Sequence, residues 1–231
     1  AEEFRVGLEG NYAPFNWTQV EADELSVPID GGMGFAAALG VKFFDADGNE
    51  LIGRGEDLAK VVRMDCSGLD PRVKDAKITV MCDVTNPLTG PDGATYTFGA
   101  QKGATPEMVA GLDAALANFA AVSGGDAGFP GAGAAGGLGF AFRTFLGGEL
   151  ESGVELVLKE TGFEERVRQA DIVVTGEGRL DAQTTMGKAP SGIAAIAKKY
   201  GKPVIGFAGC VTEDAVACND AGSDAFFPVL R

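Results

Sequence analysis

The chain has 231 residues, of which 45% are hydrophobic and 23% are charged, and this composition suits one large or two modest globular domains. Its formal net charge of −14 repels nucleic-acid phosphates and anionic lipid headgroups, so neither nucleic acid nor a bare membrane is an expected partner. The sequence contains no histidine, which excludes a Ser-His-Asp triad and histidine metal ligands.

The glycine and cysteine content further restricts the class of protein to which the chain can belong. The 35 glycines far exceed the usual share of about 7% and follow no triplet period, so they indicate tight turns and close backbone approaches. The four cysteines form no C-x-x-C pair, and a disulfide framework is not expected in a chain of this length. No apolar run approaches the roughly 20 residues of a membrane span.

The first half of the chain alternates short strands and helices. Residues 4–8 predict a strand and 10–17 an aromatic-rich loop, and the acidic stretch 21–30 predicts a linker. The elements predicted next are a helix at 33–39 ended by Gly40, a strand at 41–44, a turn at 45–48, a short helix at 57–62 and a strand at 77–84.

The middle of the chain predicts a long loop followed by helices. Residues 86–102 predict a loop with a possible hairpin at 94–98. Thr105, Pro106 and Glu107 form a strong helix start, because a hydroxyl cap, a proline and an acid suit the first turn. The segments that follow are a helix to residue 122, a glycine-rich loop at 123–137, a helix to residue 145, and helical pieces at 152–159 and 164–169.

The last 60 residues predict a β-α-β-α-β arrangement. The elements are strands at 171–175, 203–208 and 225–230 with helices at 191–200 and 213–219. Short connections between them predict a parallel sheet with helices on both faces. The predicted fold class is therefore α/β, with a Rossmann- or flavodoxin-like C-terminal portion.

Ligands of open parallel sheets bind beyond the carboxyl ends of the strands, and polar groups are dense after the predicted strand at 171–175. Glu177 and Asp181 can hold magnesium or position a hydroxyl, whereas Arg179 and Lys188 can neutralise a carboxylate or phosphate. The segment also contains Gly176, Gly178, Gln183, Thr184 and Gly187, whose glycines let backbone N–H groups approach a ligand. The alternative is a solvated loop whose charges pair with one another.

Three other segments are candidates with competing structural interpretations. Asp83 and Asn86 follow a predicted strand, but Asn-Pro and Thr-Gly are also ordinary turn sequences. Gln101 and Lys102 precede a helix N-terminus, where an anion is favoured. Residues 131–136 read GAGAAG but follow Pro130 instead of a strand, which favours a glycine-loosened helix entry or a phosphate cradle over a dinucleotide site.

Five motifs occur together in the order found in the bacterial glycerate kinase family, which residues 30–231 therefore resemble. They are DPR at 70–72, CDVTNPLTGP at 82–91, GAQKGATPE at 99–107, PGAGAAGGLG at 130–139 and TGEGRLDAQT at 175–184, completed by Gly187 and Lys188. The resemblance implies a two-domain α/β fold with the active site in a cleft. The expected domains are residues 31–168 and 169–231.

The resemblance also implies phosphoryl transfer from ATP to a hydroxyl of glycerate with a magnesium ion, in the cytoplasm. This chemistry depends mainly on positioning and electrostatics, so it needs no histidine. Glu177, Arg179, Asp181 and Lys188 are the expected catalytic residues, with Glu177 and Asp181 on the metal. The expected binding residues are Asp30, Asp83, Asn86, Gln101, Lys102, Gly176, Gly178, Gln183, Thr184 and Gly187.

The N-terminal segment departs from this family. The family begins with a longer segment, of which only Asp30, Gly31 and Gly32 are retained, and it continues beyond the last predicted strand. Residues 1–30 instead resemble the start of an extracytoplasmic amino-acid-binding protein, so we expect a chimera in which a foreign strand completes a sheet. The expectation is a glycerate-kinase-like chain that is inactive alone. The alternatives are a fold-recombination product without function and a small-solute binding module.

Overall fold

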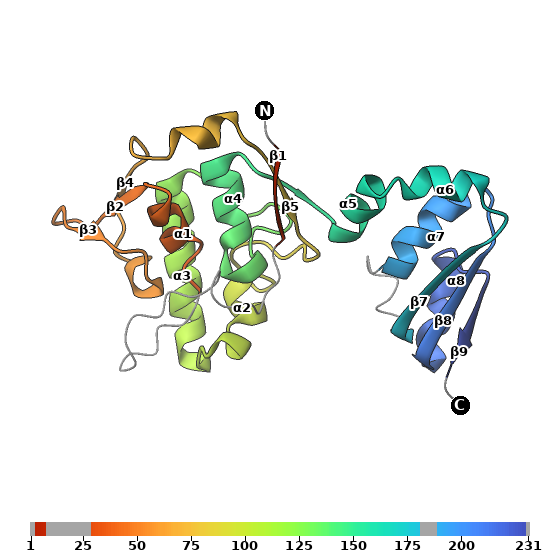
Figure 1. Ribbon diagram of the computed structural model, residues 1–231. Helices are drawn as coiled ribbons and strands as arrows, with labels where there is room; N and C mark the ends of the chain where they lie inside the picture. Colours follow the sequence, from red (N-terminus) through yellow and green to blue (C-terminus); the bar gives the residue numbers. More distant parts are fainter. Residues whose placement is uncertain (1–2, 8–28, 181–188, 230–231) are drawn as a thin grey trace. The chain divides into compact units, whose positions relative to one another are not determined.

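The computed structural model describes residues 3–7, 29–180 and 189–229 (Figure 1). The chain divides into two compact units, Ala1–Glu151 and Ser152–Arg231. Helices α5 (Gly153–Glu160) and α6 (Phe163–Gln169) pack against each other and against α7 (Ala189–Lys199) of the second unit. The domain boundary expected between residues 168 and 169 stays a prediction.

The first unit contains two small three-stranded sheets. A parallel sheet has the order β1-β5-β6, formed by β1 (Glu3–Gly7), β5 (Lys77–Met81) and β6 (Glu149–Glu151). An antiparallel sheet has the order β3-β2-β4, formed by β3 (Glu50–Leu51), β2 (Lys42–Phe44) and β4 (Arg63–Asp65). The strand predicted at residues 4–8 is thus present as β1, and it pairs in parallel with β5 along its whole length.

Four α-helices and several 3₁₀ turns complete this unit. The helices are α1 (Met33–Ala38), α2 (Ala94–Phe98), α3 (Pro106–Ser123) and α4 (Leu138–Leu146). The 3₁₀ turns are η1 (Gly55–Asp57), η2 (Pro71–Asp75), η3 (Ala100–Lys102) and η4 (Ala134–Gly136). The predicted helices at 33–39, 105–122 and near 138–145 are confirmed. None of the helices described is long and apolar enough to cross a bilayer.

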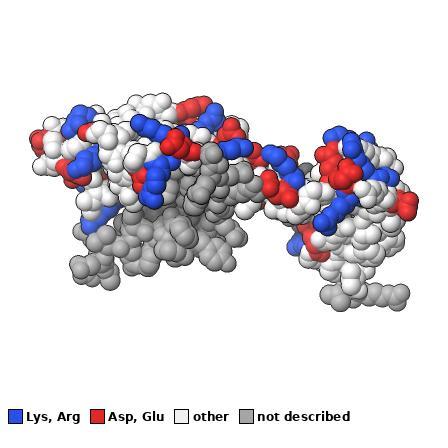
Figure 2. Space-filling model, turned by 45° about the horizontal axis from the view of Figure 1, so that its top comes forward, with Lys and Arg blue, Asp and Glu red and all other residues white. Residues whose placement is uncertain are grey.

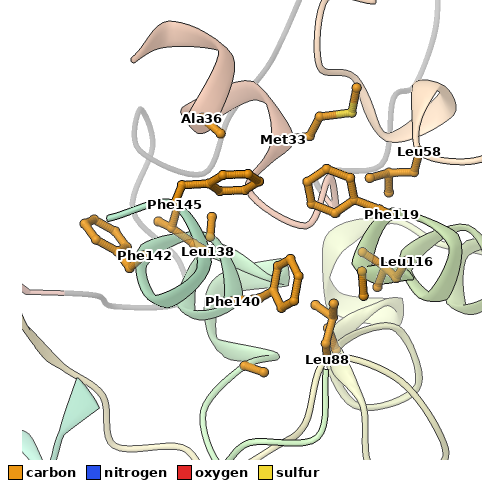
Figure 3. Packing of buried hydrophobic residues seen from close by; sticks show 14 of the residues in the cluster. Met33, Ala36, Leu58, Leu88, Leu116, Phe119, Leu138, Phe140, Phe142 and Phe145 are labelled. Atoms are coloured by element: carbon orange, nitrogen blue, oxygen red, sulfur yellow. The ribbon is translucent and has the colours of Figure 1, made fainter. Parts of the chain in front are cut away.

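The core of the first unit lies between α1, α3 and α4 (Figure 3). Phe119 of α3 is fully buried, and its ring lies 5.6 Å from that of Phe43, 5.8 Å from Phe140 and 6.2 Å from Phe145, measured between centroids. These separations suit aromatic pairs, which stabilise beyond the apolar area that they bury. Through these contacts Phe119 packs its own helix α3 against strand β2 and helix α4.

Two predicted elements of this unit are wrong. The helix predicted at residues 57–62 is only the 3₁₀ turn η1 and the turn that follows it. The possible hairpin at residues 94–98 is the helix α2. Its Thr-Tyr-Thr sequence favours a strand by propensity, but burial of Ala94 and Thr95 against the unit decides the local structure.

The second unit contains a parallel sheet in the order β7-β8-β9, which α5 and α6 precede along the chain and in which α7 connects β7 to β8. The strands are β7 (Val173–Leu180), β8 (Val204–Val211) and β9 (Ala225–Pro228). The turn η6 (Glu213–Val216) and the helix α8 (Ala217–Asp220) connect β8 to β9. The predicted α/β class and the β-α-β-α-β order are confirmed.

The described helices of this unit cover one face of the sheet. Val173 and Val204 are buried against Ala194 and Ala197 of α7. Ala208, on the same face by strand alternation, is buried with Ala215 and Cys218 of η6 and α8. On the other face Val174, Phe207 and Phe227 are exposed, and cover of that face stays a prediction.

We expect Phe119→Ala to lower the free energy of unfolding of the first unit by about 3–5 kcal/mol, because it opens a cavity among three other rings. Tyr96→Ala is the control, since Tyr96 is 50% exposed on α2 and truncation there changes stability little. Urea denaturation followed by far-ultraviolet circular dichroism measures both. Similar losses for the two variants would contradict the central place of Phe119 in the core.

Candidate active site

Three segments that are far apart in sequence meet in the first unit. They are the turn at residues 30–32, the loop at 82–93 that follows β5, and the glycine-rich loop at 131–139. The Gly31 N–H donates to the Gly136 carbonyl at 3.1 Å, and the Gly133 N–H donates to the Asn86 carbonyl at 2.9 Å. The glycine-rich loop therefore joins two other segments that sequence analysis singled out.

These contacts leave no room for side chains. A Cβ at Gly137, where φ is +104°, would lie 2.4 Å from the Gly31 Cα, and a Cβ at Gly133 would lie 2.3 Å from the Pro87 carbonyl oxygen. Real Cβ atoms do not approach backbone so closely, so the three loops can meet only if these residues are glycine. The residues 131–136 enter helix α4 through η4 and do not follow a strand, in agreement with the rejection of a dinucleotide site.

Asp30 lies at this meeting point, just before α1. Its carboxylate accepts hydrogen bonds from the N–H groups of Gly32 and Gly34, at 3.0 and 3.1 Å. Burial raises the pKa of the Asp30 carboxyl, whereas these two hydrogen bonds and the positive charge of Lys102 act to lower it. The backbone thus fixes the orientation of a half-buried carboxylate that retains lone pairs for a further donor.

Lys102, at the end of η3, is the cation whose charge acts to lower the pKa of the Asp30 carboxyl. The side chain is half-buried, and burial lowers the pKa of its amino group while the charge of Asp30 acts to raise it. Loss of water from both groups strengthens their mutual interaction. An acid with a raised pKa beside a base with a lowered pKa is a frequent feature of functional sites, although structural pairs show it too.

The other predicted residues of the first unit have different surroundings. The Asn86 side-chain amide donates to the Asp92 carbonyl at 2.8 Å and to Thr97 Oγ1 at 3.3 Å. These bonds fasten the loop to α2, so the turn interpretation of Asn86 has direct structural support. Asp83 is exposed immediately after β5, and Gln101 is exposed on η3 beside Lys102.

In the second unit, four predicted residues lie within a strand and not in a loop beyond its end. Strand β7 continues through Leu180, where Glu177 pairs with Ala208 and Arg179 with Cys210 of β8. A Cβ at Gly176 would lie 3.0 Å from the Phe207 carbonyl oxygen, so glycine here serves close strand contact. The hydrogen-bonding partner β8 extends the strand beyond the apolar run from which its end was predicted.

Glu177 and Arg179 are two residues apart on β7. Glu177 is half-buried and Arg179 is exposed. The remaining predicted residues lie outside the described part of the chain: Asp181, Gln183, Thr184, Gly187 and Lys188. Among the residues that are described, no group of three or more His, Cys, Asp or Glu side chains is arranged to hold a metal ion.

Sequence analysis did not single out Arg54, which lies close to the backbone that holds Asp30. A Cβ at Gly53 would lie 2.6 Å from the Gly34 Cα, so the Arg54 loop contacts the start of α1. Arg54 Nη1 interacts with Glu56 at 3.4 Å, but its Nε is buried without a hydrogen-bond partner among the described residues. A buried donor without a partner favours binding of a hydrogen-bond acceptor from a ligand. The only feature of the sequence that could have indicated Arg54 is its position between Gly53 and Gly55.

Lysine and arginine side chains are interspersed with acidic ones over the face of the molecule shown in Figure 2. No block of one sign dominates that view. Two described cations of the first unit are related to Asp30: the charge of Lys102 acts on its pKa, and Arg54 follows Gly53, which contacts Gly34.

Comparisons with known proteins agree with the resemblance. A model of the glycerate kinase family matches residues 26–231. The glycerate 2-kinase of Escherichia coli K12 is 49% identical over 210 residues, covering 89% of this chain and 55% of the relative. The glycerate kinase of Haemophilus influenzae is 46% identical over 211 residues, covering 89% of this chain and 56% of the relative. The chain thus spans about half the length of the curated relatives that it matches.

A solved structure gives the same result. The crystal structure of a protein described as a glycerate kinase 2, from Salmonella typhimurium LT2, superposes with a TM-score of 0.75 and 46% sequence identity, covering 87% of this chain and 54% of that chain. The family match starts at residue 26, slightly before the junction expected at Asp30. Because the family model and the relatives span most of the chain, the protein belongs to the glycerate kinase family, a family of α/β phosphotransferases.

Proposed function

We propose that this chain supplies part of a glycerate kinase active site, in which the γ-phosphoryl group of ATP passes to a hydroxyl of glycerate. The observation that carries the proposal is the half-buried Asp30, whose carboxylate is oriented by two backbone N–H groups where three glycine-containing loops meet. The charge of the half-buried Lys102 acts to lower the pKa of this carboxyl. Relatives with 46–49% identity are described as glycerate kinases. An acceptor with a hydroxyl and a carboxylate matches a site with one carboxylate and one cation.

Asp30 has the properties of a group that positions the acceptor hydroxyl. Its two oxygens are oriented by the N–H groups of Gly32 and Gly34, and the raised pKa of its carboxyl makes it a better proton acceptor than an ordinary aspartate. Lys102 offers a cation for the carboxylate of glycerate. Phosphoryl transfer depends mostly on such positioning and charge.

The nucleotide side of the site is assigned to the second unit. We assign Glu177 and Arg179 to it, with Asp181, Gln183, Thr184, Gly187 and Lys188 beyond the end of β7. Magnesium usually takes only one or two protein carboxylates together with water and phosphate oxygens, so Glu177 and Asp181 are a sufficient set of donors. The ion would supply neutralisation of phosphate charge when bound.

The chimera hypothesis remains part of the proposal. Strand β1 pairs in parallel with β5, so the N-terminal segment completes the edge of the β1-β5-β6 sheet. Strand pairing asks chiefly for a suitable backbone, whereas catalysis needs particular side chains held within about 1 Å. The chimera hypothesis therefore predicts a chain that folds better than it catalyses.

Asp30→Asn should make the protein more stable at pH 7, because burial raises the pKa of the native carboxyl and disfavours its charged form. The stability that wild type has below the ordinary carboxyl pKa is lost as the pH rises through the raised pKa of the folded state. The advantage of Asp30→Asn should therefore shrink towards pH 4. Thermal unfolding at several pH values measures the difference.

The matched control for this experiment is Asp92→Asn, which removes one negative charge from an exposed position in the same unit. A stability difference between wild type and Asp30→Asn that stays constant between pH 4 and pH 7 would contradict the raised pKa. An equal pH trend for Asp92→Asn would assign the effect to net charge.

Lys102→Met should weaken D-glycerate binding by roughly tenfold to a hundredfold, since a hydrogen bond to a charged group contributes about 1.5–3 kcal/mol. Lys74→Met is the control, because Lys74 is exposed on η2. Isothermal titration with D-glycerate gives both dissociation constants. Equal affinities for the two variants would remove Lys102 from the site.

We expect the chain alone to phosphorylate glycerate at no useful rate, because a catalytic site needs every group in place. A coupled assay of ADP release with D-glycerate tests this. Clear glycerate-dependent turnover that Asp181→Ala abolishes would contradict the expectation and would show that these residues suffice.

A further inference from the structure

Helix α3 supports the turn that contains Asp30. A Cβ built on Gly31 would lie 2.9 Å from Phe119 Cδ1 and 3.1 Å from Leu116 Cδ2. Both of these α3 side chains are fully buried, and they are three residues apart, so they lie on the same face of the helix. The apolar face of α3 is therefore in direct contact with the backbone of the candidate site.

Two half-buried polar side chains of α3 each bind the backbone of a loop. The Asp113 carboxylate accepts the Gly90 N–H, with distances of 3.0 and 3.2 Å from the nitrogen to its two oxygens. The Asn118 amide donates to the carbonyls of Leu58 and Val61 at 2.9 and 3.0 Å. The Asp113 bond joins residues that are 23 positions apart, so it fixes tertiary structure and not a local turn.

The Asp113 bond is made to a turn near the end of the loop at residues 82–93. The Gly90 carbonyl accepts the Gly93 N–H at 2.8 Å, and Gly90 has a φ of +90°. A Cβ on Gly90 would meet no atom within 4 Å, so glycine is needed here for its backbone conformation and not for space. Asp113 thus attaches α3 to a turn whose geometry glycine permits.

The same loop also holds the glycine-rich loop in place. The Asn86 carbonyl accepts the Gly133 N–H at 2.9 Å, and the Gly136 carbonyl accepts the Gly31 N–H at 3.1 Å. Backbone hydrogen bonds therefore connect the loop that Asp113 binds to the turn of the candidate site. Closely packed protein interiors transmit displacements from one segment to the next, so a shift of the first loop reaches that turn.

We propose that Asp113 is a positioning residue of the candidate site, which holds the loop at residues 82–93 through the Gly90 N–H and thereby keeps the glycine-rich loop against the turn that contains Asp30. A carboxylate suits this task, because hydrogen bonds to an ionised acceptor are shorter and stronger than neutral ones. Asp113 acts through the loops and takes no part in phosphoryl transfer. The inference rests on the proposed function only for the identity of the ligand that these loops bind.

Amide hydrogen exchange of the isotope-labelled full chain, followed by nuclear magnetic resonance, tests the positioning directly. In Asp113→Ala the Gly133 and Gly31 amides should exchange roughly tenfold faster than in wild type, because a bond to a charged group is lost. The Val62 amide is the internal reference, since it donates to the Phe44 carbonyl at 2.9 Å away from these loops. Unchanged rates at Gly133 and Gly31 would overturn the proposal, as would an equal rise at Val62, which would indicate a general loss of stability.

Isothermal titration with D-glycerate separates a positioning role from a purely structural one. Asp113→Ala should weaken binding roughly tenfold, whereas Asp113→Asn should restore most of the affinity, because its amide oxygen still accepts the Gly90 N–H. Asp65→Ala is the matched control: the Asp65 carboxylate accepts the Ser67 N–H at 2.8 Å outside these loops, so its removal should leave the dissociation constant unchanged. Asp113→Ser, whose side chain is too short to reach Gly90, takes the place of Asp113→Ala if circular dichroism shows that the alanine variant does not fold.

The outcomes of the two measurements are distinct. Equal affinities of wild type and Asp113→Ala would overturn the proposal. An Asp113→Asn variant that binds as weakly as Asp113→Ala would also overturn it, because the effect would then come from charge and not from the hydrogen bond. A wild-type chain that binds no D-glycerate would contradict the proposed function, and amide exchange alone would then decide whether Asp113 positions the loops.

Discussion

The contact between the Gly31–Gly32 turn and the glycine-rich loop is the constraint on which the first unit depends. The Gly31 N–H bonds to the Gly136 carbonyl, and a Cβ on Gly32 would lie 2.3 Å from that of Ala141 on α4. This approach brings α1 onto α4 and closes the core above Phe119, whose ring is 2.9 Å from a Cβ built on Gly31. The same contact orients Asp30, so the same backbone atoms serve the packing of the core and the candidate site.

Energetically unfavourable features are concentrated where these loops meet. Asp30 loses water although it carries a charge, and burial raises the pKa of its carboxyl. Ala135, inside the glycine-rich loop, has a left-handed backbone with φ of +54° and ψ of +36°, which is unfavourable for a residue with a Cβ. Strained or desolvated groups persist only where the surrounding structure holds them. Their concentration between the loops supports the assignment of function to the first unit.

The two units differ in hydrophobic burial and in the elements that carry their candidate site residues. In the first unit, a buried aromatic cluster around Phe119 holds short elements together and leaves loops free to converge. In the second unit, a parallel sheet carries Glu177 and Arg179 along β7 and has helical cover on one described face. Hydrophobic burial thus stabilises a platform in one unit, whereas in the other it remains incomplete at Phe207 and Phe227.

Local sequence alone determined the elements whose signals are local. Pro106 and Glu107 mark the start of α3, where the predicted cap by the Thr105 hydroxyl is wrong because that side chain makes no capping hydrogen bond. The β-α-β-α-β order after residue 170 specifies a parallel sheet. Tertiary structure decided the rest, because burial outweighs propensity at α2 and because pairing with β8 carries β7 through Leu180. It also decided which candidate residues meet. Asp30 and Lys102 influence each other's ionisation across a long stretch of sequence, and no local pattern could have indicated that.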